Sequence, residues 1–149
     1  MTKSKQLLSS LMLSFCICIA SAFGQSIDEK DIIGNWEIQG TLMGEDGSGA
    51  LLPHKNVSPD CKDYSVFLDD YSGKDVRHKQ DCEAREQEFS WEINDDVLTL
   101  SRGERSIKWH IASIEENTMT VGVQLKPDSE NRMYVQYKKV GESAKSKKQ

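Results

Sequence analysis

The chain has 149 residues, which leaves room for one domain with tails and excludes a (β/α)₈ barrel or a two-domain dinucleotide enzyme. Its formal net charge is −5, and an acidic chain without a basic cluster in its folded part argues against a nucleic-acid partner. Three Trp, four Tyr and four Phe are more aromatic residues than disordered chains usually contain.

The N-terminal segment, residues 1–24, is typical of a secretory signal peptide. Lys3 and Lys5 precede an apolar run that is shorter than the roughly 20 residues a membrane-spanning helix needs. Small residues permit cleavage after Ala22 or after Gly24, and an uncleaved membrane anchor is the alternative. We therefore expect an exported protein, periplasmic or secreted, without a stable membrane span once the signal is removed.

Of the four cysteines, Cys16 and Cys18 lie inside the apolar run. A bulky residue precedes each of them, whereas a lipoprotein signal needs a small residue there. The exported chain would keep Cys61 and Cys82, and an even pair in an oxidising compartment predicts a disulfide. Two free or metal-binding thiolates are the alternative, but neither cysteine has His or Cys neighbours at zinc spacing. We expect no metal site.

The first part of the exported chain contains a short helical signal and then a strand. Ser26 and Glu29 have the S-x-x-E spacing of a capping box, which predicts one helical turn ending near Ile33. From Asn35 onward apolar and polar residues alternate with a period of two, as in a half-buried strand. The glycine-rich stretch 44–59 shows no period and predicts a loop or flap.

The rest of the chain reads as a meander of strands separated by short turns. Alternating or apolar runs, with one weak polar segment at Val76, predict strands near 64–68, 76, 88–93, 97–102, 107–111, 119–125 and 133–137. Neighbouring strands joined by short turns must be antiparallel. The pattern predicts an all-β domain over residues 25–140 with about eight strands, followed by a disordered Lys-rich tail at 141–149. Such a meander hides its edges by closing into an up-and-down barrel, and a two-sheet sandwich is the alternative.

Several short motifs occur in an order that resembles a known family. Gly34-Asn35-Trp36 opens the first strand after a helical turn, as the G-x-W motif of lipocalins does. The later pieces are Cys61-Lys62-Asp63, Leu68-Asp69-Asp70, Gly73, Cys82, Phe89 to Ile93, Leu98 to Leu100, Ile111 with Ser113, Thr118 to Val121 and Tyr137 to Lys139. From roughly Asp28 to Lys139 the chain resembles the bacterial lipocalin-like domains of small exported proteins. Lipocalins often stack an Arg near the last strand on the G-x-W Trp, and here only Lys138 or Lys139 is available for that role.

The resemblance implies an eight-stranded antiparallel barrel in which Gly34 and Trp36 are structural and Trp36 points inward near a closed end. Alternation then places the following residues inside as well: Ile38, Leu42, Phe89, Trp91, Ile93, Leu98, Leu100, Ile107, Trp109, Ile111, Val121, Val123, Val135 and Tyr137. Plain core packing is one interpretation of this set. The other is a ligand pocket, for which the candidates are Leu42, Phe89, Trp91, Leu100, Trp109, Val123 and Tyr137.

The sequence contains no recognisable grouping of residues typical of a catalytic site. His54 falls in the flap, His78 in a polar strand and His110 on an outward face, and none has a Cys, Ser or carboxylate at a suggestive spacing. The sequence also lacks a phosphate-binding loop and a G-x-S-x-G motif. We expect no enzyme activity and no cofactor.

Two functional hypotheses remain open. The first is an exported lipocalin-like protein that binds a small hydrophobic ligand in its barrel. The second is a small exported barrel with a filled interior that contacts a protein partner through its surface or the 44–59 loop, in an inhibitor-like or structural role.

Overall fold

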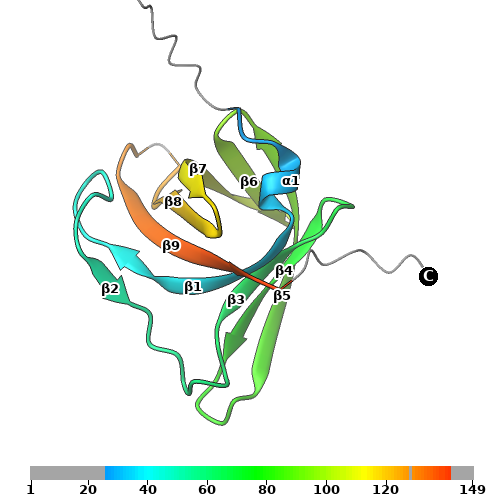
Figure 1. The fold of residues 1–149 in the computed structure, drawn as a ribbon. Helices are drawn as coiled ribbons and strands as arrows, with labels where there is room; N and C mark the ends of the chain where they lie inside the picture. The colour runs from blue at the N-terminus through cyan, green and yellow to red at the C-terminus, as the bar shows by residue number, and fades with distance from the viewer. Residues whose placement is uncertain (1–25, 128, 142–149) are drawn as a thin grey trace, which may run out of the picture.

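The computed structural model describes residues 26–127 and 129–141, so the proposed signal peptide and most of the Lys-rich tail lie outside the described residues. One helical turn precedes nine strands (Figure 1). Their bounds are α1 Glu29–Ile32, β1 Gly34–Leu42, β2 Leu51–Pro53, β3 Tyr64–Phe67, β4 Ser72–His78, β5 Ala84–Asn94, β6 Val97–Arg102, β7 Arg105–Glu115, β8 Thr118–Gln124 and β9 Arg132–Val140.

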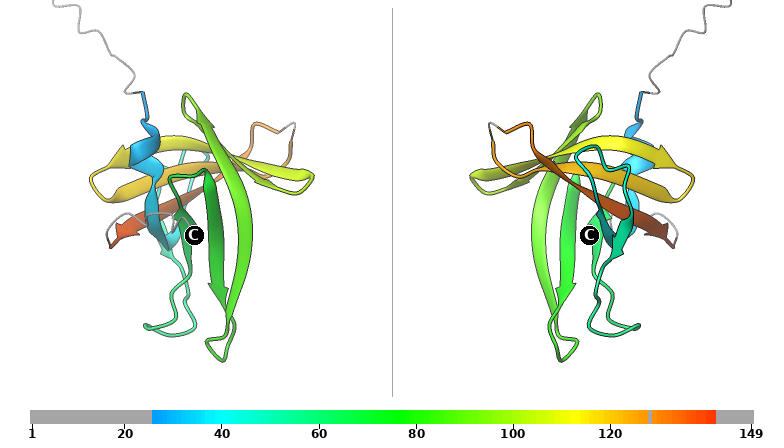
Figure 2. Two further views of the ribbon diagram at one scale, coloured as in Figure 1. Left: turned by 90° about the vertical axis from the view of Figure 1, so that its right-hand side faces the viewer. Right: turned by 90° about the vertical axis from the view of Figure 1, so that its left-hand side faces the viewer.

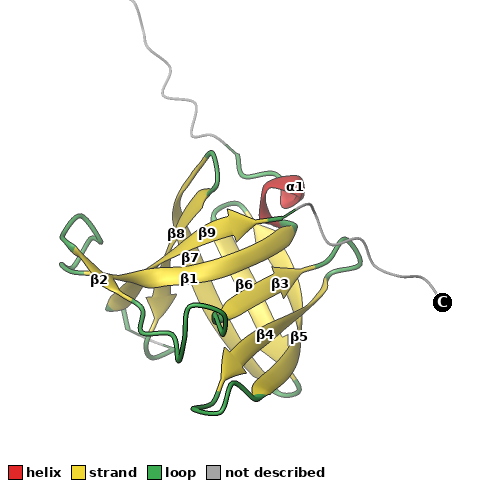
Figure 3. Ribbon diagram, turned by 60° about the horizontal axis from the view of Figure 1, so that its bottom comes forward, coloured by secondary structure: helices red, strands yellow, loops and turns green. Residues whose placement is uncertain are grey.

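The strands form a closed antiparallel barrel. β1 pairs with β3, each later strand pairs with the next as far as β9, and β9 returns to pair with β1 (Figure 3). Eight strands form the closed ring, because β2 only extends the sheet beside the far end of β1. The predicted all-β, eight-stranded antiparallel barrel is confirmed. A sandwich would have left the β1–β9 edges open, whereas closure pairs both of them.

The helical turn occurs where the sequence predicts it but begins at a different residue. Asp28, not Ser26, is the N-cap, and its side chain accepts a hydrogen bond from the backbone N–H of Lys30 at 3.1 Å. Asp31 completes the capping box by accepting from the backbone N–H of Asp28 at 3.1 Å. The correction has a simple reason: Asp caps a helix as well as Ser does, and here a carboxylate lies three residues further on.

The segment predicted as a loop contains a short strand. β2 pairs with Gly40–Leu42 of β1, and the backbone N–H of His54 continues the pairing by donating to the Gln39 carbonyl at 2.8 Å. All three residues of β2 are exposed, so no alternation of buried and exposed positions marks this strand in the sequence. The chain then runs beside the β4–β5 hairpin, which extends beyond the rest of the barrel (Figures 1 and 2).

The core fills the end of the barrel next to α1, which we call the closed end. Most of the residues predicted to point inward belong to the buried cluster, which continues toward the other end of the barrel, or pack against it. Two differ: Ile107 is 38% exposed, and Leu42 is only half-buried. The buried cluster also contains Ile32, Phe67 and Met119, which the predicted inward set lacked.

Candidate functional site

The closed end is sealed around Trp36, which is fully buried in the structure. Its indole N–H donates to the Ile32 carbonyl at 2.7 Å, so the last residue of α1 satisfies the polar atom that burial would otherwise leave unpaired. The ammonium of Lys139 lies over the ring, with Nζ 5.1 Å from the ring centroid. Gly34 has a φ of +142°, and a Cβ at that position would lie 2.6 Å from Lys139 Cε. The positive φ is a backbone conformation that residues with a Cβ rarely adopt, so glycine is favoured at this position.

Aromatic side chains fill the space beside Trp36. Phe67 lies at the centre of this group, with ring-centroid distances of 5.3 Å to Phe89, 5.7 Å to Trp91 and 6.1 Å to Trp109. The Trp91 indole N–H donates to the Leu68 and Ser72 carbonyls at 3.2 and 3.1 Å. This part of the interior is packed core.

The opposite end of the barrel, which we call the open end, contains a solvent-open cavity of about 310 Å³. That volume is at the lower limit for sites that bind small molecules. The cavity is lined by Ile38, Thr41, His54, Asp75, Arg77, Leu100, Arg102, Ile107, Trp109, Val123, Met133, Val135 and Tyr137.

The structure divides the seven predicted pocket residues into two groups. Four of them line this cavity: Leu100, Trp109, Val123 and Tyr137. The other three, Leu42, Phe89 and Trp91, lie outside it. Phe89 and Trp91 pack around Phe67 in the filled part, and a register shift between Ile38 and Gly40 gives the lining position to Thr41 instead of Leu42.

Trp109 and Tyr137 form the aromatic wall of the cavity. Their rings stack with centroids 5.2 Å apart and an interplanar angle of 27°. Burial raises the pKa of the Tyr137 phenol, and nearby Arg77 lowers it only in part. The phenol is therefore neutral at physiological pH and offers a hydroxyl group to the cavity.

A charged cluster that was not predicted from the sequence lines the same cavity. Asp75 is buried, accepts a hydrogen bond from the Ser65 hydroxyl at 2.5 Å and forms ion pairs with Arg77 and Arg102. Arg77 also donates to the Tyr64 carbonyl at 2.9 Å, and Arg102 lies over the Phe89 ring at 5.7 Å. Arg102 follows Leu98 and Leu100 at every second position of β6. This alternation in the sequence could have predicted that Arg102 lies on the inner face.

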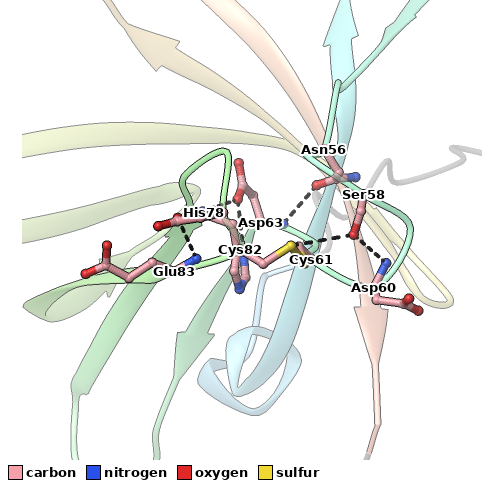
Figure 4. Close-up of a disulfide and its surroundings, with 9 residues drawn as sticks. Asn56, Ser58, Asp60, Cys61, Asp63, His78, Cys82 and Glu83 are labelled. Atoms are coloured by element: carbon pink, nitrogen blue, oxygen red, sulfur yellow. Dashed lines mark hydrogen bonds and ion pairs between the residues drawn. A yellow bond between two sulfur atoms is a disulfide. The ribbon is translucent and has the colours of Figure 1, made fainter.

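A second polar cluster ties the segment after β2 to the barrel (Figure 4). Asp63 hydrogen-bonds to His54 Nε2 at 2.9 Å and accepts from the backbone N–H of His78 at 2.8 Å. Burial acts to raise the pKa of Asp63, but these hydrogen bonds outweigh it and hold the pKa below its usual value. The spacing of these residues in the sequence did not indicate this site, because residues 54, 63 and 78 meet only after the chain folds.

The predicted disulfide is confirmed beside this second cluster. Cys61 and Cys82 are joined with an S–S length of 2.00 Å and a Cα–Cα distance of 5.7 Å. The bond fastens the segment before β3 to the β4–β5 turn, as Figure 4 shows. Together with the Asp63 contacts it holds His54 at the edge of the cavity.

His110 lies on β7 outside the cavity lining, and its side chain is half-buried. Burial, with a contribution from Arg132, lowers its pKa. Among residues 26–127 and 129–141, no three His, Cys, Asp or Glu side chains are grouped as metal ligands would be. No helix in that part of the chain is long and apolar enough to cross a membrane.

Comparison with known proteins agrees with this architecture. The lipocalin-like domain family matches residues 29–121, from α1 into β8. The chain belongs to this family. No curated protein matches the chain. In this lipocalin-like domain, the matched region includes the Gly34-Asn35-Trp36 motif, the two disulfide-bonded cysteines and the Asp75, Arg77 and Arg102 cluster.

Proposed function

We propose that this lipocalin-like domain is an exported binding protein that holds a small molecule with an apolar body in its barrel. The observation that carries the proposal is the cavity of about 310 Å³ at the open end, opposite the packed core around Trp36. Trp109, Tyr137 and the aliphatic lining residues offer apolar surface, and the few polar groups on one wall would orient a ligand. A lipocalin-like barrel is typically a binding fold and not a catalytic one.

Export is the second part of the proposal. The Cys61–Cys82 disulfide supports it, because such bonds persist in oxidising compartments. The expected exported protein begins at Phe23 or Gln25. Intact-mass measurement of the protein recovered outside the cytoplasm tests this, and a mass that still includes Met1 to Gly24 would contradict signal cleavage.

Ligand extraction tests the binding function directly. The purified exported protein is analysed by native mass spectrometry before and after denaturing extraction, and the released compound is identified by its mass. We expect a bound small molecule that the Trp109→Ala variant loses or exchanges. An empty native protein, together with no saturable change in Trp emission for any apolar compound below about 100 μM, would contradict the proposal.

A second candidate function rests on the apolar surface around β2. Met43, Leu51, Leu52 and Val57 are each more than a third exposed, and β2 leaves one strand edge unpaired by the described strands. Exposed apolar side chains on a strand edge favour contact with a protein partner. Replacing Leu52 with Lys should abolish such a contact without changing small-molecule binding, so pull-down and ligand titration separate the two functions.

A further inference from the structure

The side chains that line the open end carry a net positive charge, whereas the chain as a whole is acidic. The whole chain carries a net charge of −5, yet the cavity wall contains two guanidinium groups, Arg77 and Arg102, and one acidic side chain, Asp75. The Asp75 carboxylate is already engaged by Ser65 and by both arginines. One positive charge on this wall is therefore not balanced by a lining residue.

Strand register adds two more arginines to the same face. Arg77 is directly opposite Arg85 in the β4–β5 pair, and Arg102 is directly opposite Arg105 in the β6–β7 pair. Directly paired residues share a sheet face, so Arg85 and Arg105 continue the inner face outward from the cavity. Like charges placed directly opposite each other are destabilising. We call these four residues the arginine cluster.

One further acidic side chain, Asp63, lies near Arg77 without lining the cavity. Asp63 is near enough to Arg77 for that cation to lower its pKa, but its two oxygens are occupied by His54 and by the backbone N–H of His78. Arg102 Nε is buried and has no hydrogen-bond partner in the structure. A buried N–H donor of this kind costs stability unless something accepts from it, and an anion would satisfy both the donor and the charge.

We propose that the ligand carries a single anionic oxyacid head, such as a carboxylate, which binds Arg102 and Arg77 while its apolar body lies against Trp109 and the aliphatic lining residues. This inference rests on the proposed function, because it assigns the chemistry of a ligand in the same cavity. Arg85 and Arg105 attract the head toward the open end, and Arg102 Nε donates to it. The guanidinium fork matches the geometry of a carboxylate.

The test compares three probes with the same alkyl chain and different heads: decanoic acid, decanol and decylamine. Binding to the exported protein at neutral pH is followed by Trp emission and confirmed by native mass spectrometry. A hydrogen bond to a charged group is stronger than one between neutral groups, so decanoate should bind at least about tenfold more tightly than decanol. Decylamine should bind most weakly, and added salt should reduce the advantage of decanoate.

Variants with opposite expected effects separate a head-group site from a purely structural cluster. Arg102→Gln should remove the preference for decanoate, so that the ratio of decanoate to decanol affinity falls to about one. Asp75→Asn removes the internal competitor for the guanidiniums, so it should raise decanoate affinity. The Arg85→Gln/Arg105→Gln double variant changes only exposed side chains and should weaken decanoate alone. Arg132→Gln, an exposed β9 residue outside the cavity lining, is the matched control.

The outcomes distinguish the two proposals. Equal affinity for decanoate and decanol, or tightest binding of decylamine, would overturn the anionic head while leaving the binding function intact. A neutral compound identified in the extraction experiment would have the same meaning. If none of the three probes binds better than about 100 μM and the native protein carries no molecule, both proposals fail. If Arg102→Gln and Arg132→Gln behave alike, the arginine cluster is not the head-group site.

Discussion

Lys139, near the end of the last strand, places its ammonium 5.1 Å from the ring centroid of Trp36 on the first strand. The same ammonium donates to the Asp31 carbonyl at 3.1 Å, so one side chain joins β9, β1 and α1. Burial lowers the pKa of Lys139, and Asp31 opposes that effect. Lipocalins often use an Arg for this contact. In this chain Lys139 takes the role, and Lys138 is exposed.

Replacing Lys139 with Met should destabilise the barrel, while the same change at Lys138 should not. Met retains the apolar stem but removes the cation–π contact and the hydrogen bond to Asp31, at a cost of about 0.5–2 kcal/mol. The free energy of unfolding from urea titration measures the difference. An equal effect of the two substitutions would show that the Lys139–Trp36 contact does not contribute to stability.

The Trp36→Ala variant should lose about 3–5 kcal/mol of unfolding free energy, because it leaves a large cavity in the closed end. It also removes the indole N–H that donates to the Ile32 carbonyl, so the helical turn loses its attachment. Urea unfolding followed by circular dichroism provides the measurement. Since Trp36 does not line the ligand cavity, the affinity of the folded fraction for decanoate should remain within about twofold. A large loss of affinity in the folded protein would contradict this separation.

Removing the Cys61–Cys82 bond should cost roughly 2–4 kcal/mol, mainly because the unfolded chain becomes less constrained. The Cys61→Ser/Cys82→Ser double variant and the reduced wild-type protein should lose similar amounts, and each serves as a control for the other. Alkylation of the unreduced, denatured exported protein should label neither Cys61 nor Cys82. Two labelled thiols would contradict the disulfide in the exported form.

The Asp63→Asn variant should lose about 1–3 kcal/mol at neutral pH, because it weakens the bonds to His54 and to the His78 backbone. The folded pKa of Asp63 lies below its ordinary value of 3.8, so the unfolded state binds the proton more readily. The stabilisation by Asp63 is therefore complete above that ordinary value and is lost as pH falls through the folded pKa.

Urea titrations at a series of acidic pH values test this dependence. The wild type should lose more stability than Asp63→Asn as the pH falls. Asp60→Asn, at an exposed neighbouring position, serves as the control and should follow the wild type. Parallel pH curves for Asp63→Asn and the wild type would contradict the assignment.

Replacing Trp109 with Ala should enlarge the ligand cavity and shift its preference toward bulkier apolar ligands. Trp91→Ala is the matched control, because it removes the same side chain from the packed part of the interior, outside the cavity lining. Both variants should lose about 3–5 kcal/mol of stability, but only Trp109→Ala should change the ratio of affinities for large and small ligands. Identical ligand preferences in both variants would place the binding site elsewhere.

The strands and their inward-facing residues could be predicted from local sequence patterns. Apolar and polar residues alternate with a period of two along β5 to β9, and turn residues such as Asp95 and Glu116 have positive φ. This pattern predicts the strands and their inward-facing side chains without knowledge of which strands pair. Because neighbouring strands are joined by short turns, their antiparallel pairing follows from the chain itself. The buried positions of Trp36, Trp91, Trp109 and Tyr137 therefore follow from alternation.

Which residues line the cavity depended on contacts between strands that are far apart in the sequence. A shift in the β1–β9 register decided that Thr41, and not Leu42, lines the cavity, and the position of Phe67 decided that Phe89 and Trp91 belong to the filled end. Asp75 and Arg77 already share one face of β4, but only the pairing of β4, β5 and β6 brought Arg102 to Asp75.

The same distinction holds for Asp63, which meets His54 and His78 only because the disulfide and the strand pairing return the chain to one place. Alternation states which side of a strand a residue occupies. It contains no information about the height at which residues from different strands meet inside the barrel, because strand stagger and side-chain volume set that height and both arise only when the barrel closes.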